Sequence, residues 1–330
     1  VRTAEFRLST YTSSDQFRAR VAALRSGGFV AAWHSNGQDT WGQGVYAQVF
    51  NAAGVKVGAE VQLHTVYRSE QINPVLAGLA DGSFVAAWES YDDLTGGAWN
   101  TMYRRFSATG VPLMNETRIS AMVQREQQYP VLTALASGGF AAAWSSVAQD
   151  MNGWSIATRR FSPAGAPLDT ESRANTFVVG DQHFPQITAV PGGGYVVAWQ
   201  SGSQEPSWGV YAQRYSAAGA PVGDEMRLNV TTADNQSELA LAPTATGFRA
   251  AWASWAQDTS GAGVFTRSFA PNSAPVLTDA NVGTLPSIQD TMVNGPGTRI
   301  SVLLADADAV TDADTGALEG IAVHATTSNG

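Results

Sequence analysis

Apolar and small residues alternate in a nine-residue segment that recurs five times along the chain. Its first copy is GGFVAAWHS at 27–35. The later copies lie at 82–90, 138–146, 193–201 and 246–254. The tryptophan of this segment returns about every 55 residues, a period typical of propellers, solenoids or repeat arrays. Both faces of the segment are apolar, which is expected of a strand whose sheet packs between two neighbouring sheets.

Each repeat has the pattern of four short strands separated by turn residues. In the fourth repeat the strands are predicted at 185–190, 194–201, 209–216 and 225–229. Glycine-rich or polar turns lie between them. Four-stranded sheets that are apolar on both faces and recur at a fixed period are typical of the blades of a β-propeller.

The two ends of the repeat region complement each other. The fifth repeat lacks its fourth strand, because Pro271 follows its third strand, whereas the N-terminal segment 4–10 matches a fourth strand. Glu5 corresponds in this register to Glu60, Glu116, Glu171 and Glu225. We therefore predict an all-β chain with a five-bladed β-propeller of four-stranded blades over 1–270, in which the N-terminal strand closes the last blade.

Residues 271–330 differ in character from the repeats. They begin as a linker and contain strand-like segments at 299–305 and 320–326. This region is similar to the first part of a cadherin-like or immunoglobulin-like module, which needs about 100 residues for a complete sandwich. We predict a partial β-sandwich-like domain here.

The repeat pattern resembles one found in large bacterial secreted proteins. The segments are of the type G-G-F-V-V-A-W, then Q-D-x-x-G, G-V-Y-A-Q-R-F and G-x-E-x-x-x-N, and they cover 4–270. Such repeats resemble those of type I-secreted, RTX-associated or cadherin-like surface proteins, which implies a secreted or cell-surface location. Five-bladed closure is also similar to that of tachylectin-type lectins and of some furanoside-cleaving glycosidases.

Composition and charge exclude several classes of partner. The formal net charge is −9, with 19 Lys and Arg against 28 Asp and Glu, so a nucleic-acid partner is not expected. No apolar run approaches the roughly eighteen residues of a membrane span, so membrane insertion is not expected. Cysteine is absent, which excludes disulfides.

An acidic cluster in the C-terminal region suggests Ca²⁺ as a cofactor. Four aspartates fall within nine positions: Asp306, Asp308, Asp312 and Asp314. Oxygen ligands at such spacing suit Ca²⁺, although the pattern is not an EF-hand. An acidic, solvated turn explains the same residues equally well.

Polar and aromatic residues recur in two sets of loops that share one face of a propeller. Indoles can stack on sugar rings, and carboxylates and amides can bond to sugar hydroxyls. Turn chemistry and contacts between blades are the structural alternative. The candidate ligand-binding residues are Trp41, Trp208, Gln16, Gln71, Gln127, Gln182, Gln236, Asp15, Glu70, Glu126 and Asp181.

These features favour a non-catalytic extracellular module for binding or adhesion, with a glycan or surface polymer as its partner. A structural unit that pairs with other copies of the chain is one alternative. A glycoside hydrolase is another, and it needs two carboxylates in different environments, about 5–10 Å apart. Glu238, which has no counterpart in the other repeats, would then pair with Asp15, Glu70 or Asp181.

Overall fold

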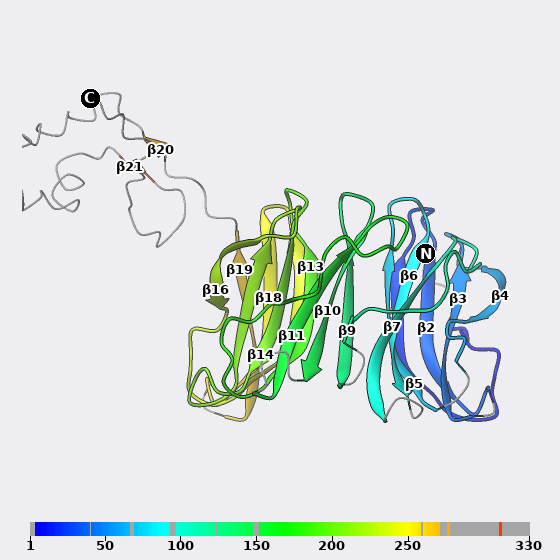
Figure 1. Cartoon of the computed structure of the whole chain (residues 1–330), viewed down its shortest axis with the longest axis horizontal. Coiled ribbons are helices and arrows are strands. Elements are labelled where there is room, and N and C mark those ends of the chain that lie inside the picture. The colour runs from blue at the N-terminus through cyan, green and yellow to red at the C-terminus, as the bar shows by residue number, and fades with distance from the viewer. Residues whose placement is uncertain are drawn as a thin grey trace, which may run out of the picture. The chain divides into compact units, whose positions relative to one another are not determined.

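The computed structural model describes most of the repeat region and two short stretches beyond it. The described residues are 4–39, 41–66, 69–92, 97–122, 125–147, 152–258, 260–270, 276–277 and 310–311. They contain β-strands and no helix, so none of the described residues forms a helix that could cross a membrane. The all-β prediction is confirmed (Figure 1).

Five sheets follow one another along the chain, each an antiparallel meander in chain order. The first has β1 (Gln16–Ala23), β2 (Phe29–Asn36), β3 (Gln43–Phe50) and β4 (Lys56–Gln62). The second has β5 (Gln71–Gly78), β6 (Phe84–Asp92), β7 (Ala98–Phe106) and β8 (Thr117–Arg118). The third has β9 (Gln127–Ala134), β10 (Phe140–Val147), β11 (Trp154–Phe161) and β12 (Ser172–Arg173). The fourth has β13 (Gln182–Ala189), β14 (Tyr195–Ser201), β15 (Gly209–Tyr215) and β16 (Pro221–Arg227), and the fifth has β17 (Gln236–Thr244), β18 (Gly247–Trp255) and β19 (Ala262–Phe269).

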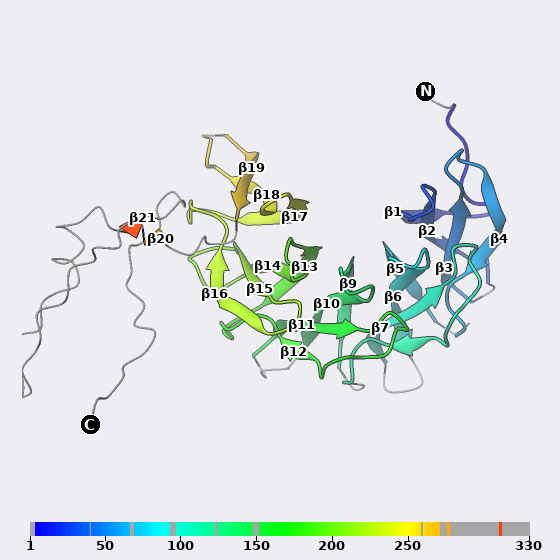
Figure 2. The ribbon, with the colours of Figure 1, turned by 90° about the horizontal axis from the view of Figure 1, so that it is seen from above.

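The sheets are the blades of the predicted propeller, and they stand side by side in an arc (Figure 2). The first strand of each blade lies on the concave side of the arc, and we call β1, β5, β9, β13 and β17 the inner strands. The repeated segment found in the sequence forms the second strand, and its tryptophan is buried in every blade.

Alternate residues of each second strand face opposite neighbours, which explains why both faces are apolar. In β6, Phe84 and Trp88 pack in one core with residues of the first blade. Val85 and Ala87 pack in another core with residues of the third blade. The same arrangement continues between the third, fourth and fifth blades, so the apolar core is divided into layers between blades.

The structure differs from the prediction at the closing strand. The fifth sheet has three strands among the described residues, and 4–10 is not assigned as a strand. The facing sides of the end blades are open to solvent: Val21 in β1 is 63% exposed and Val264 in β19 is 82% exposed. The arc is therefore not closed by an outer strand paired with β19.

The N-terminal segment nevertheless lies where an outer strand would meet the first blade. Leu8 packs against a core cluster that contains Trp33 and Phe50. Its counterpart in the next repeat, Leu63, is buried in the same way between the first and second blades. Residues 4–10 thus contact the first blade as an outer strand would, but they do not pair with β19, the third strand of the fifth blade.

The repeated glutamate of the outer strand links neighbouring blades. Its carboxylate accepts a hydrogen bond from a backbone N–H at the end of the preceding outer strand or of the N-terminal segment. The four bonds run from Thr10 to Glu60 (2.7 Å), Thr65 to Glu116 (2.6 Å), Ala121 to Glu171 (2.7 Å) and Thr176 to Glu225 (2.6 Å). Contacts between blades therefore account for the recurrence of this residue.

Residues 270–330 form a separate compact unit. Within it β20 (Val276–Leu277) pairs with β21 (Val310–Thr311). The predicted sandwich remains a prediction, and the four aspartates proposed for Ca²⁺ lie outside the described residues. Elsewhere, the described residues contain no group of three or more acidic or histidine side chains that could hold a metal ion.

Candidate functional site

Every inner strand is interrupted at the same place by a β-bulge. One residue of each bulge has a positive φ although it is not glycine: Arg18 (53°), Asn73 (53°), Tyr129 (55°), Phe184 (54°) and Glu238 (52°). Such conformations are uncommon for L-residues, they redirect a side chain, and they cluster at functional sites. The bulges were not predicted, because these five side chains differ in type and leave no repeated sequence pattern.

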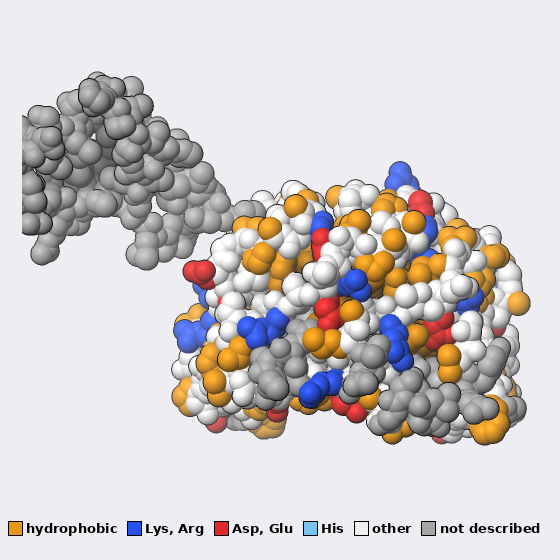
Figure 3. Space-filling model, viewed as in Figure 1, with side chains coloured by type: hydrophobic (Ala, Val, Ile, Leu, Met, Phe, Trp, Pro, Cys, Tyr) orange, Lys and Arg blue, Asp and Glu red, His pale blue; other side chains and the backbone are white. Residues whose placement is uncertain are grey.

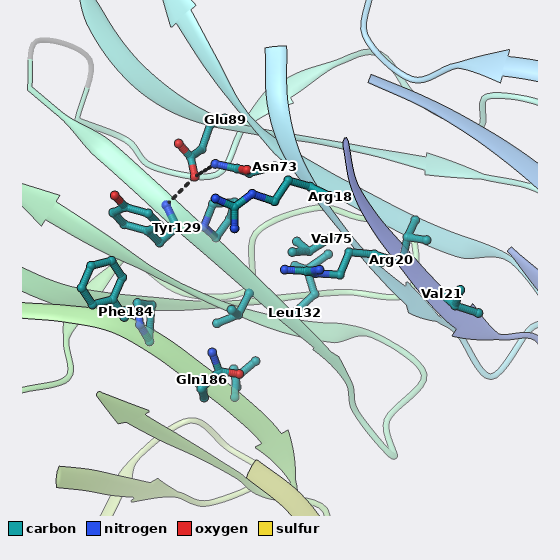
Figure 4. Close-up of a pocket in the computed structure, with 15 residues that line it drawn as sticks. Arg18, Arg20, Val21, Asn73, Val75, Glu89, Tyr129, Leu132, Phe184 and Gln186 are labelled. Atoms are coloured by element: carbon teal, nitrogen blue, oxygen red, sulfur yellow. Dashed lines mark hydrogen bonds between the residues drawn. The ribbon is translucent and has the colours of Figure 1, made fainter. Parts of the chain in front are cut away.

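Four of the five bulge residues line a cavity of about 350 Å³ on the concave side of the first four blades (Figure 4). We call it the axial cavity. Its volume lies at the lower end of the range typical of small-molecule sites, roughly 300–1,000 Å³. The side chains that can act on a ligand there are Arg18, Arg20, Glu89, Tyr129, Phe184 and Gln186. Glu238 occupies the corresponding bulge of β17 but does not line the axial cavity.

Glu89 is the acidic residue of the axial cavity. It belongs to β6 and is 3% exposed. Its Oε1 accepts hydrogen bonds from Asn73 Nδ2 and from the backbone N–H of Tyr129, both at 3.1 Å. Within the described part of the chain its Oε2 has no hydrogen bond, and in Figure 4 this oxygen points away from both donors.

The environment of Glu89 favours its protonated form. Burial raises the pKa of Glu89 above its ordinary value, and the two hydrogen bonds and the charge of Arg18 oppose that rise. The position is not shared by the repeats, since the residue after the buried tryptophan is His34, Ser145, Gln200 or Ala253 in the other blades. That difference was visible in the sequence, but the side chain stood in a strand that was interpreted only as core.

Burial and nearby charges also shift the pKa of two neighbouring residues, His34 and Tyr129. Burial and the charge of Arg18 lower the pKa of His34 to about 4, so its ring is neutral near pH 7. Its Nδ1 accepts a hydrogen bond from the backbone N–H of Asn73 at 3.2 Å. Burial, then the charge of Glu89, raises the pKa of Tyr129, while Arg18 opposes the rise.

The two aromatic bulge residues form one wall of the axial cavity. The rings of Tyr129 and Phe184 are 4.8 Å apart in an edge-to-face arrangement, and Phe184 is 41% exposed. An exposed aromatic face beside hydrogen-bonding groups is suited to the apolar side of a sugar ring.

The glutamines predicted to bind a ligand lie inside the blades. Four of them, Gln71, Gln127, Gln182 and Gln236, are 0% exposed. Gln127 and Gln236 accept hydrogen bonds from the indole N–H of Trp144 and Trp252, at 2.7 and 3.1 Å. Gln16 is partly buried and donates to the backbone carbonyl of Ser14. None of the five lines the axial cavity, and their amides hold the start of each inner strand.

The acidic candidates mostly connect one blade to the next. Three of the four accept a hydrogen bond from the backbone N–H at or near the start of the preceding blade's third strand. The pairs are Gln43 to Glu70 (3.2 Å), Trp99 to Glu126 (3.0 Å) and Trp154 to Asp181 (3.1 Å). Asp15 is exposed, and its backbone carbonyl accepts from Asn36 N. Neither these acids nor Glu238 line the axial cavity, so the expected pair of carboxylates is not formed there.

The two loop tryptophans belong to different blades. Trp41 precedes β3 and is 65% exposed. Trp208 precedes β15, is partly buried, and its indole lies beside Gly202. Neither lines the axial cavity.

No protein-family model matches this chain. No curated protein matches it either. Several solved structures are similar to it. An endo-arabinase from Bacteroides thetaiotaomicron shares 10% identity over 79% of this chain and 95% of its own, with a TM-score of 0.44. A Bacillus subtilis levansucrase shares 8% identity over 80% of this chain and 88% of its own, with a TM-score of 0.44. An alpha-L-arabinofuranosidase from Lactobacillus brevis shares 5% identity over 76% of this chain and 90% of its own, with a TM-score of 0.43.

These structures correct one expectation from the sequence. We expected a non-catalytic adhesion module, whereas the proteins that this chain is similar to are carbohydrate-active enzymes. The non-catalytic interpretation is therefore not carried forward. At TM-scores of 0.43–0.44 the similarity concerns the fold and identifies neither a substrate nor a reaction.

Proposed function

We propose that this chain cleaves glycosidic bonds and that the axial cavity is its active site, with Glu89 as the proton donor. The observation that supports this most directly is the environment of the Glu89 carboxyl group. One of its oxygens is held by two hydrogen bonds, the other has none from the described residues, and burial favours the protonated carboxyl. A general acid needs this combination of fixed position and raised pKa.

In the proposed reaction the proton leaves Glu89 Oε2 for the glycosidic oxygen as the bond to the anomeric carbon breaks. The sugar ring then carries positive charge in an oxocarbenium-like transition state. The aromatic wall of Tyr129 and Phe184 would hold the apolar face of the ring, and Gln186 offers an amide to its hydroxyls.

A second carboxylate has to activate water or attack the anomeric carbon. We assign this role to Glu238, which occupies the same bulge position on the fifth inner strand. All five inner strands lie on the concave side of the arc (Figure 2), so closure of the arc would bring the fifth bulge towards the other four. The proposal therefore requires both Glu89 and Glu238.

The test is release of reducing sugar from a panel of purified polysaccharides, including arabinan, levan, galactan and polygalacturonate, by the 330-residue protein. Glu89→Gln and Glu238→Gln should each lower the rate by at least about 100-fold. Asp224→Asn, an exposed acid on β16, is the control and should not change it. Full activity in Glu89→Gln, or no release from any polymer by the wild type, would refute the proposal.

Two further sequence-based expectations remain proposals. The resemblance of the repeats supports a secreted or cell-surface location. Ca²⁺ binding by the aspartates at 306–314 rests on residue type and spacing alone.

A further inference from the structure

We infer that the sugar bound in the axial cavity carries a negatively charged group, which Arg18 and Arg20 recognise together. This inference rests on the proposed function, since it names the class of substrate for the same site. It concerns binding, so it can be tested apart from cleavage.

The two arginines lie two positions apart on β1, on either side of its bulge. Both are exposed and both line the axial cavity. In the described part of the chain neither forms an ion pair. Arg20 donates a hydrogen bond to the backbone carbonyl of its neighbour Ala19 at 3.2 Å. Figure 4 shows both side chains extending into the space between β1 and the inner strands of the next blades.

Some arginines elsewhere in the fold form ion pairs. Arg160 forms an ion pair with Asp169, with Nε 2.7 Å from Oδ2, and Arg105 pairs with Asp81. On the face seen in Figure 3, basic and acidic side chains are interspersed. Among the described residues, Arg18 and Arg20 thus place two guanidinium groups without an ion pair in one cavity of a protein whose formal net charge is −9.

The described lining of the axial cavity can neutralise at most one of these two charges. Among the described residues that line it, Glu89 is the one carboxylate, and its second oxygen accepts no hydrogen bond from either arginine. With Glu89 protonated and Glu238 ionised, as the proposed function requires, two guanidinium groups still face one carboxylate, so the site has a net positive charge. An anionic group on the ligand would supply the missing partner.

The chemistry of arginine indicates which anionic groups the ligand carries. A guanidinium presents parallel N–H donors that match the two oxygens of a carboxylate or of a sulfate ester. Val75 and Leu132 line the same cavity as Arg20, and apolar surroundings strengthen an ionic contact relative to open water. The anionic group would thus lie along β1, with the sugar ring between it and Phe184 on the opposite side.

The experiment is calorimetric titration of the 330-residue Glu89→Gln variant with three probes. These are a galacturonate trisaccharide, the neutral galactose trisaccharide and a sulfated galactose trisaccharide. An acidic probe should bind at least about tenfold more tightly than the neutral one, a difference of about 1.4 kcal/mol, and more weakly as salt rises. The carboxylate and sulfate probes show which oxyanion is preferred.

Arg18→Ala and Arg20→Ala should each remove this preference. Arg249→Ala, whose guanidinium bonds to Ser268 outside the cavity, is the matched control and should retain it. Equal affinity for all three probes, or a preference that survives both arginine substitutions, would overturn the inference. Binding with the expected preference but without cleavage by the wild type would support the inference and refute the proposed function.

Discussion

The backbone N–H of Tyr129 donates a hydrogen bond to the carboxylate of Glu89 at 3.1 Å, and this bond joins the third blade to the second. The bulge in β9 gives Tyr129 a positive φ, and its N–H is used for Glu89 in place of a partner within its own sheet. The candidate proton donor is therefore positioned by the neighbouring blade. Its geometry depends on how the blades pack and not on its own strand alone.

The pH dependence of cleavage should report the pKa of Glu89. A general acid must be protonated, so the rate falls as the pH rises through that pKa, which lies above the ordinary value. The hydrogen bond from Asn73 lowers this pKa. Glycine tolerates the positive φ of this position, so Asn73→Gly removes the hydrogen bond without straining the backbone. The substitution should therefore move the alkaline limb of the pH–rate profile to higher pH. An unchanged limb would show that Glu89 does not carry the proton.

The links between blades should contribute measurably to stability. Glu225 accepts hydrogen bonds from the N–H and hydroxyl of Thr176 and from the amide of Gln204. Glu225→Ala should lower the free energy of unfolding by about 2–3 kcal/mol. The adjacent Asp224 is exposed, and Asp224→Ala should stay within about 0.5 kcal/mol of the wild type. Urea denaturation of both variants checks this, and equal effects would show that the link is not stabilising.

The repeat register provides a fifth linking glutamate, Glu5. Its partner by analogy is the backbone N–H of Val230, which follows Leu228 as Thr10 follows Leu8. We expect the N-terminal segment to pair with β19 when the arc closes, so Glu5→Ala should lower the free energy of unfolding about as much as Glu225→Ala. If Glu5→Ala behaves like the Asp224→Ala control, the arc stays open in solution.

Acidification should destabilise the fold through His34. In the unfolded chain this histidine binds a proton below about pH 6.5, whereas in the folded chain its pKa is lowered to about 4. The unfolded state then binds more protons, so the free energy of unfolding falls as the pH drops from about 6.5 to 4. The titration of one group changes the free energy of unfolding by at most about 1.4 kcal/mol per pH unit.

Comparison with His34→Gln isolates this contribution, because glutamine is the residue at the same position of the fourth blade, Gln200. The variant should lose less stability than the wild type between pH 6 and 4 when both are followed by thermal unfolding. Parallel losses would mean that His34 is protonated in the folded protein.

The sequence alone determined the all-β class, the five repeats and the strands of each blade. The reason is that burial between two neighbouring sheets imposes one apolar pattern on every second strand. Trp33 and its four counterparts belong to that strand, and all five are buried. The recurrence of Glu60 and Gln71 was also read correctly as a feature of every repeat.

Only the tertiary structure decided what those recurring polar residues do and where the cavity lies. Gln71, Gln127, Gln182 and Gln236 are buried, and Glu60 and Glu70 bond to neighbouring segments, because a repeated polar residue serves a contact that every blade needs. The residues of the proposed site, Arg18, Glu89 and Phe184 among them, break the repeat. Residues from separate blades come together only when the blades pack side by side. The sequence also predicted a closing strand that the structure leaves unpaired, since pairing with β19 depends on the distance between the two ends of the arc.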